Sequence, residues 1–208
     1  MSVSVKMNRS GPSTPLVQMR SFDLFPTRIW QGNLSHLAAK YPDWEAHVAK
    51  LRAESPVPAG RTMRAGWNSP DMAVLNDPTL SDLRLAVDAH VRDVLELMRQ
   101  SSLPYFLDSW VNMHDRGGFN FAHAHEGCYL SGCFCVKVPE GSGSLVFRDP
   151  RPGTRYSAFQ GNGVNCYKDV KLAPHAGLLV LFPSWLEHFV EPHEGDESRI
   201  TIAFNARP

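Results

Sequence analysis

The sequence has no excess of charge of either sign. Lys plus Arg and Asp plus Glu each number 21 among its 208 residues, so the formal net charge at pH 7 is zero. Proteins that bind nucleic acid or an anionic membrane surface normally carry a basic patch or stripe. We see none along this chain, and therefore expect neither nucleic acid nor a membrane to be its main partner.

Long hydrophobic runs are also absent from the sequence. The longest apolar stretches, such as Leu178 to Pro183, are far shorter than the roughly 20 residues that a membrane-spanning helix needs. Residues 1–15 are polar and Ser-rich, without the apolar centre of a secretory signal. We expect these residues to be a disordered tail and the protein to be cytoplasmic.

Cysteine is scarce, with four in the chain. Cys133 and Cys135 are separated by one residue, a spacing that rarely forms a disulfide, so we expect reduced thiols that pack as small core residues rather than metal ligands. The chain is long enough to fold as a single domain over residues 16–208 without disulfides or metals. Any metal site would therefore be functional.

The first half of the chain has a mixed pattern. Residues 21–30 alternate like a short extended segment. Asp43 is placed to cap a helix over about residues 43–53, with Trp44, Val48 and Leu51 on one face. Thr79 and Asp82 resemble a capping box for a second helix over about residues 79–100. Apolar residues recur at helical spacing along this second segment, so we expect one face of it to pack on the core.

From Pro104 onward the pattern changes to alternation and short apolar runs. The predicted strands are residues 105–113, 129–138, 144–148, 177–182, 186–191 and 199–205. Many short strands after two helices predict a mainly β fold, a sandwich or jelly roll over about residues 104–208 with helices packed against one sheet. Residues 150–174 lack periodicity, which is typical of a lid or a binding loop.

Three histidines have a spacing that indicates a metal site. His123 and His125 are two residues apart, which on a strand turns both imidazoles to the same face. His188 follows a buried strand and a proline turn, which would bring its ring back over the first pair. An isolated pair of this kind is weak evidence, and the third histidine strengthens it.

Arg199 and Thr201 lie in the last predicted strand, beginning eleven residues after His188. They share one face of that strand, so a guanidinium and a hydroxyl could hold one carboxylate. Arg199 is surrounded in sequence by apolar residues, and a guanidinium that faces a core requires an anion. The alternative is an arginine on the solvent face of an edge strand.

These motifs together resemble the 2-oxoglutarate/Fe(II)-dependent oxygenases, and most closely a bacterial and phage group of that superfamily. The resemblance extends from about Phe22 to the C-terminus. Besides the histidines, it is carried by Gly66-Trp67-Asn68-Ser69, Ser109-Trp110-Val111-Asn112, Leu130-Ser131-Gly132, Phe147-Arg148-Asp149-Pro150-Arg151, Leu181-Phe182-Pro183-Ser184-Trp185 and Arg199-Ile200-Thr201-Ile202-Ala203-Phe204-Asn205.

The resemblance implies a double-stranded β-helix, a cupin-like jelly roll. It implies that Fe(II) is bound by His123, His125 and His188, and that Arg199 with Thr201 binds the cosubstrate 2-oxoglutarate. The enzyme would be a dioxygenase that uses O2, with hydroxylation as the default reaction and a small molecule or a peptide as substrate. The oligomeric state stays open, with a homodimer among the options.

Further candidates come from strand positions near these residues. Asn112, Tyr129 and Ser131 are candidate contacts for the cosubstrate, with structural hydrogen bonding as the alternative. Trp67, Asn68, Ser69 and Trp185 are candidates for the wall of the substrate pocket, with packing as the alternative for Trp67. We interpret His114, His175 and His193 as solvated, and Asp149 with Arg151 as a salt bridge that fixes the 150–174 loop.

The pattern departs from the usual triad of the superfamily, which has two histidines and one carboxylate. Here His125 stands at the carboxylate position, as is usual in the closer group, and three neutral ligands leave the metal more positive. Glu126, the next residue, could supply a carboxylate only if a bulge turned it to the same face.

Two rival interpretations remain at this stage. The sequence also resembles the cupins, whose motifs include an HxH pair and the separation found between Gly177 and Pro183. A three-histidine cupin could act as a dioxygenase or an isomerase without 2-oxoglutarate, but it leaves Arg199 and Thr201 unexplained. The other rival is a non-enzymatic small-molecule binding module on the same fold.

Overall fold

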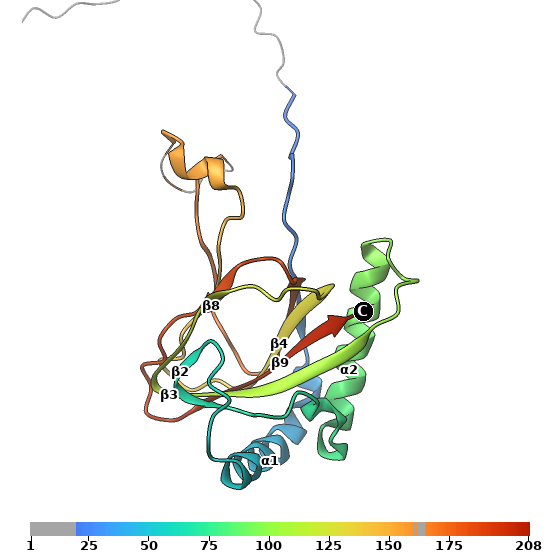
Figure 1. Cartoon of the computed structure of the whole chain (residues 1–208), viewed down its shortest axis with the longest axis vertical. Helices are drawn as coiled ribbons and strands as arrows, with labels where there is room; N and C mark the ends of the chain where they lie inside the picture. The colour runs from blue at the N-terminus through green and yellow to red at the C-terminus, as the bar shows by residue number, and fades with distance from the viewer. Residues whose placement is uncertain (1–19, 160, 162–164) are drawn as a thin grey trace, which may run out of the picture.

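The structure is a computed structural model that describes residues 20–159, 161 and 165–208 (Figure 1). The predicted tail, residues 1–15, lies outside the described residues. The strands are β1 (Trp30–Asn33), β2 (Met63–Asn68), β3 (Phe106–His123), β4 (Leu130–Lys137), β5 (Leu145–Phe147), β6 (Val170–Leu172), β7 (Leu178–Pro183), β8 (His188–Val190) and β9 (Arg199–Arg207). The helices are α1 (Tyr41–Glu54) and α2 (Ser81–Leu97), and the 3-10 helices are η1 (Ser35–Lys40), η2 (Val74–Asn76), η3 (Pro78–Leu80) and η4 (Pro152–Tyr156).

The strands form one curled antiparallel sheet in the order β1-β7-β4-β9-β3-β8-β5-β6, with β2 paired to β3. Helices α1 and α2 lie on one side of this sheet (Figure 1). The mainly β fold with flanking helices is therefore confirmed. In the described part of the chain, no helix has the length and apolar character required to cross a membrane.

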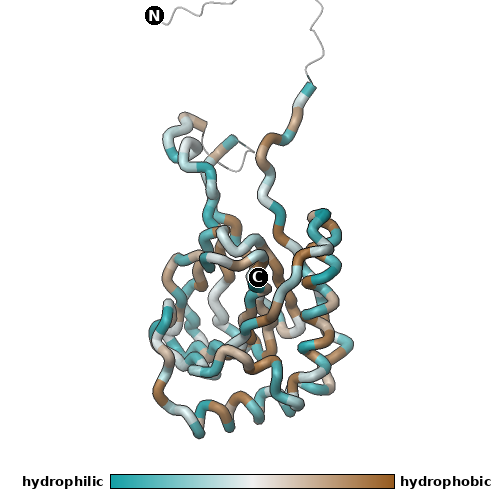
Figure 2. The backbone as a smooth tube through the Cα atoms, turned by 45° about the vertical axis from the view of Figure 1, so that its right-hand side comes forward, coloured by the Kyte–Doolittle hydropathy of each residue, from teal (hydrophilic) through white to brown (hydrophobic). Residues whose placement is uncertain are grey.

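Alternation along the central strand β9 separates the core from the site. Ile200, Ile202 and Phe204 are buried in the main hydrophobic cluster with Trp44 of α1 and Val87 of α2. The residues between them on β9 turn to the opposite, concave face of the sheet. Figure 2 shows hydrophilic and hydrophobic residues alternating along the backbone. One strand thus anchors the helices with one set of side chains and lines a cavity with the other.

The two predicted helices are present, but both predicted caps are wrong. Helix α1 begins at Tyr41, so Asp43 lies inside its first turn. Helix α2 begins at Ser81 and its N-cap, Leu80, makes no side-chain cap hydrogen bond. The Thr79 N–H donates instead to Asp77 Oδ1 at 2.8 Å, which caps the short helix η3 before α2. Because η3 forms a separate turn before it, α2 begins at Ser81 rather than after a cap at Thr79.

Each predicted strand overlaps a strand of the structure, but the boundaries differ. Strand β3 runs past residue 113 to His123, and the extended segment over residues 21–30 has strand structure only from Trp30. Strands β2 and β6 were not predicted. β2 lacks alternation because its pairing with β3 shifts register between Arg64 and Gly66, where Ala65 has a φ of 48°.

The loop after β5 projects from one end of the sheet and carries η4 at its tip (Figure 1). The predicted Asp149–Arg151 ion pair is present at its base, with Nη2 2.7 Å from Oδ2. Tyr156 and Phe159 on the loop are 90% and 70% exposed. The tip of the loop around η4 therefore stands apart from the sheet, whereas β6 near its end pairs with β5.

Candidate metal centre and cosubstrate pocket

His123 and His188 are direct cross-strand partners in the antiparallel pair β3–β8. His125 follows two residues after the end of β3, held by its N–H, which donates to the Ser184 carbonyl at 2.9 Å. One ring nitrogen from each of the three histidines lies within 4.8 Å of the others. The structure thus brings together the three histidines that the sequence singled out.

Hydrogen bonds set the orientation of two of these rings. Nδ1 of His123 lies 2.7 Å from the Phe121 carbonyl, and Nδ1 of His188 lies 2.9 Å from the Leu186 carbonyl. A carbonyl oxygen only accepts, so each Nδ1 carries the hydrogen and each Nε2 has a free lone pair. Metal-binding histidines are commonly held in this way by a backbone carbonyl.

Burial keeps the imidazoles neutral. Burial, with a smaller contribution from the neighbouring His123, lowers the pKa of His188 to about 3 and that of His125 to about 4. Burial lowers the pKa of His123 as well. Neutral imidazole is the form that binds a metal ion, so all three rings are in the ligand form at neutral pH.

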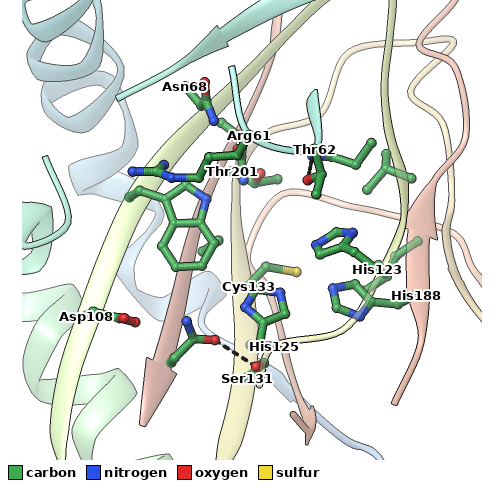
Figure 3. A pocket seen from close by; sticks show the side chains of 18 of the residues that line it. Arg61, Thr62, Asn68, Asp108, His123, His125, Ser131, Cys133, His188 and Thr201 are labelled. Atoms are coloured by element: carbon green, nitrogen blue, oxygen red, sulfur yellow. Dashed lines mark hydrogen bonds between the residues drawn. The ribbon is translucent and has the colours of Figure 1, made fainter. Parts of the chain in front are cut away.

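The histidines open on a cavity of about 300 Å³ in the concave face of the sheet (Figure 3). Cross-strand rows of side chains on β3, β9 and β4 line it. The deepest row pairs His114 with Arg199, the next Asn112 with Thr201, and the third Trp110 with Ala203 and Cys133; the last has Asp108, Asn205 and Ser131. Arg207, beyond the last row, is exposed and marks the mouth.

Arg199 is a buried cation at the closed end of this cavity. It is 2% exposed, and its Nε and Nη1 have no hydrogen-bond partner. No carboxylate among the described residues forms an ion pair with it. A buried guanidinium without an anion is costly, so this arrangement favours binding of a small anion from the cavity. Thr201 lines the cavity one row nearer the mouth.

The expectation that His114 and His193 are solvated is wrong. His114 is 1% exposed, with Nε2 2.7 Å from Asn120 Oδ1, and His193 is 0% exposed, with Nε2 2.6 Å from the Glu197 carbonyl. His114 is covered by its strand partner β9. His193 lies in the loop between β8 and β9, and its main chain is hydrogen-bonded to Gly117 and Gly118 of β3. Neither contact is visible in the pattern of one segment. His175 is exposed.

The predicted cosubstrate contacts divide between the two faces of the sheet. Asn112 and Ser131 line the cavity, and Ser131 Oγ donates to Asn205 Oδ1 at 2.7 Å. Tyr129 does not line it, which corrects the prediction for this residue. Its ring packs against the main hydrophobic cluster, because Tyr129 precedes β4 rather than sharing the strand face of Ser131.

Of the predicted pocket wall, only Asn68 lines the cavity. Trp67 is a core residue whose Nε1–H donates to the Ser55 carbonyl at 2.7 Å. Ser69 Oγ donates to the Asp71 carbonyl and accepts from the Val111 N–H, so it fixes a loop. Trp185 is 57% exposed and lies outside the cavity lining. The structure therefore supports the alternative interpretation of Trp67, in which this residue packs in the core.

Several cavity residues were missed by the sequence analysis. Trp110 stacks on the His125 ring at 5.7 Å between centroids, and the Arg61 guanidinium lies 5.5 Å from the Trp110 ring. Cys133 lines the cavity, which corrects its assignment as a core residue, and burial raises the pKa of its thiol to about 12. Strand alternation could have identified two of them. Trp110 is two residues from Asn112 on β3, and Cys133 is paired with Ala203, two residues from Thr201 on β9.

The sequence matches a known family over the part of the chain that forms this site. Residues 108–205 match the family model described as "Putative 2OG-Fe(II) oxygenase". The part of the chain that forms the site is thus similar to the 2OG-Fe(II) oxygenases. Members of this family use Fe(II), 2-oxoglutarate and O2. No curated protein is significantly similar in sequence to the chain.

Solved structures of oxygenases share the fold of the whole described chain. A Pseudomonas putida prolyl-4-hydroxylase aligns with a TM-score of 0.63 and 17% identity, over 87% of this chain and 92% of that one. The 2-oxoglutarate-dependent epimerase SnoN from nogalamycin biosynthesis aligns with a TM-score of 0.63 and 19% identity, over 87% and 77%. HygX from Streptomyces hygroscopicus, solved with nickel and 2-oxoglutarate, aligns with a TM-score of 0.61 and 14% identity, over 88% and 83%. The predicted jelly roll is therefore confirmed.

The site fits the two groups that the 2OG-Fe(II) oxygenases use. The three histidines present neutral nitrogen donors that suit Fe(II) among other metals. The Arg199 guanidinium, whose Nε and Nη1 have no partner, suits a carboxylate such as the distal one of 2-oxoglutarate. The three histidines and Arg199 line the same cavity. A ketoacid that binds the metal at one end and the guanidinium at the other requires this arrangement.

Proposed function

We propose that this oxygenase couples the oxidative decarboxylation of 2-oxoglutarate to hydroxylation of a C–H bond in a small-molecule or peptide substrate. The observation that carries the proposal is Arg199: a buried guanidinium without a hydrogen-bond partner on Nε and Nη1, in the cavity of the three histidines. A metal site alone would not require this cation, whereas a dicarboxylate cosubstrate does.

In this proposal His123, His125 and His188 hold the iron, each through one ring nitrogen. Arg199 holds the distal carboxylate of 2-oxoglutarate at the closed end of the cavity, and the Thr201 hydroxyl donates to it. Asn112 and Ser131 are the further polar side chains on the same concave face. Iron and 2-oxoglutarate then supply the chemistry: O2 converts the ketoacid to succinate and CO2, and its second oxygen atom turns C–H into C–OH.

The protein's own contribution is positioning and exclusion of water. Trp110 stacks on His125 and limits the movement of that ring. Phe182 and Leu145 add apolar surface to the cavity, which strengthens the charge interactions within it. Because burial keeps the three imidazoles neutral, no protein group beside the metal needs to lose a proton before iron binds.

We further propose that the iron has three neutral protein ligands. Glu126 borders the cavity and is exposed, but its carboxylate is not part of the cluster of ligand atoms formed by the histidines. The missing negative charge leaves the metal more attractive to an anionic cosubstrate. This would make the ketoacid contribute more to holding the iron than it does where a carboxylate ligand is present.

The decisive experiment is an anaerobic visible spectrum of the full chain with Fe(II), recorded before and after 2-oxoglutarate is added. A new charge-transfer band on addition of the ketoacid is the expected result. Iron binding without a band would instead favour the three-histidine cupin without 2-oxoglutarate. Failure to bind iron would favour the binding module.

A further inference from the structure

A groove of about 980 Å³ adjoins the cosubstrate cavity. It is bordered by α2, by the first residues of β3 and by the segment from Asp71 to Asn76. The cavity and the groove share Met72, Asp108 and Arg207, so the groove begins at the mouth of the cavity. A substrate whose reacting group lies near the histidines can therefore continue into the groove.

One edge of β3 is not covered by a strand where it borders the groove. Strand β2 pairs with β3 only from Asn112 onward, so residues 106–108 have no strand on that side. The partner of Leu107 on β9 is Ala206, whose carbonyl accepts from the Tyr129 N–H beside β4. Ala206 thus directs its main-chain groups away from β3, and Leu107 directs its own away from β9.

The main-chain groups of Ser109 and Val111, further along β3, also point away from β9. The Ser109 N–H donates to the Met72 carbonyl at 2.7 Å, and the Val111 carbonyl accepts from the Ser69 N–H at 3.1 Å. Both bonds lie on the side away from β9. Leu107 is the next residue in this alternation, and no described residue forms a hydrogen bond with its main chain there. Its N–H and C=O therefore face the groove as a free donor and a free acceptor.

Asp108 adds a second unpartnered group at the junction of the cavity and the groove. It is 7% exposed; Oδ2 accepts from Arg207 Nη1 at 3.3 Å, whereas the buried Oδ1 has no partner. A buried carboxylate oxygen without a donor is unfavourable, so the site favours a ligand that brings an N–H or an O–H. In Figure 3 Asp108 lies across the cavity from His123 and His188.

Two large apolar side chains border the groove and are open to solvent. Leu85 on α2 is 67% exposed and Phe106 on β3 is 57% exposed. They come from opposite sides of the groove, one from the helix and one from the strand. An apolar side chain of a ligand placed between them would bury both.

We propose that the substrate is an extended polypeptide segment that adds to the free edge of β3. Its main chain pairs with the N–H and C=O of Leu107, an N–H of the segment donates to Asp108 Oδ1, and one apolar side chain contacts Leu85 and Phe106. The reacting side chain enters the cavity. A peptide unit supplies the donor and acceptor pair that this edge lacks, as in other cases of strand addition. Hydroxylation of this segment rests on the proposed function, whereas its binding in the groove does not.

The test uses the full chain labelled with ¹⁵N and a pool of random hexapeptides with acetylated and amidated ends. We expect a subset of peptides to bind and to move the Leu107 amide resonance. Methylation of one main-chain nitrogen of a bound peptide should abolish binding. Leu85→Lys and Phe106→Lys should each weaken it about tenfold through loss of apolar contact. Leu97→Lys is the matched control, because Leu97 is 68% exposed on α2 and outside the groove.

Absence of peptide binding would overturn this inference, as would binding that leaves the Leu107 resonance and the Leu85→Lys affinity unchanged. Binding of Fe(II) and 2-oxoglutarate is measured on the same preparation. If the chain takes up both but binds no peptide, the inference fails and the proposed function stands. If peptides bind at Leu107 but iron or 2-oxoglutarate does not bind, the groove is a peptide site and the proposed function fails.

Discussion

Arg199 and His114 are direct cross-strand partners on β9 and β3, and both side chains are buried. Burial, with a smaller contribution from the nearby Arg199 charge, lowers the pKa of His114 to about 4. His114 is therefore neutral at the closed end of the cavity, and Arg199 is the cation there. A positive charge on His114 would be repelled by the Arg199 guanidinium.

This pKa predicts a contribution of His114 to acid sensitivity. In the unfolded chain its pKa is near the usual value of 6.5 and in the folded chain about 4, so between these values the unfolded state binds more protons. Stability must then fall as the pH decreases through this window, by on the order of 3 kcal/mol for His114. His114→Gln should flatten the pH dependence of the free energy of unfolding, measured in urea at several pH values, compared with His175→Gln. Equal slopes for the two variants would contradict the assignment.

The unpartnered guanidinium of Arg199 predicts opposite effects on binding and on stability. Arg199→Met should weaken 2-oxoglutarate binding on the order of a hundredfold, since a charge-assisted bidentate contact contributes about 2 to 3 kcal/mol. Without cosubstrate, the same change should raise the free energy of unfolding by about 1 to 4 kcal/mol, because it removes a buried unpaired charge.

Calorimetric titration of 2-oxoglutarate and urea denaturation without it would measure the two effects of Arg199→Met. Arg92→Met on the exposed face of α2 is the control. If 2-oxoglutarate binds to the Arg199→Met variant as it does to the parent, Arg199 does not have the role proposed.

The three-histidine cluster predicts that metal binding depends on each member. His188→Ala should lower the affinity for Fe(II) by more than the roughly 10- to 100-fold typical of an outer-shell partner, since it removes a donor atom itself. His175→Ala, at an exposed histidine outside the cavity, should leave the iron content unchanged. Iron content after anaerobic loading and gel filtration measures both. A full iron content in His188→Ala would show that the metal binds elsewhere.

The close packing around Gly132 predicts that a larger side chain at this position lowers the stability of the fold. A Cβ at this residue of β4 would lie 2.4 Å from Phe204 Cζ and 2.6 Å from the Val180 carbonyl oxygen. Gly132→Ala should destabilise the chain by about 1 to 3 kcal/mol, the range typical of overpacking. Gly153→Ala meets no atom within 4 Å and serves as the control. Thermal unfolding of the two variants at the same pH would measure the difference, and equal midpoints would be inconsistent with this packing.

The sequence by itself determined the fold class and singled out the candidate site residues. Alternation after Pro104 indicated the strands, because a half-buried strand exposes every second residue to a different medium. The HxH pair, the late histidine and Arg199 predicted a metal and anion site, because these side chains among apolar neighbours need partners. The spacing of residues along the chain therefore carried most of the information about the chemistry.

The tertiary structure decided which residues of distant segments lie next to one another. His114 was expected to be solvated and is buried because β9 lies beside it. Tyr129 was expected to share the face of Ser131 and packs instead in the core. The free edge at Leu107 depends on where β2 stops pairing with β3, and the burial of Asp108 Oδ1 without a partner depends on the strands around it. Such facts depend on strand register and contacts between distant residues, which the pattern of a single strand does not contain.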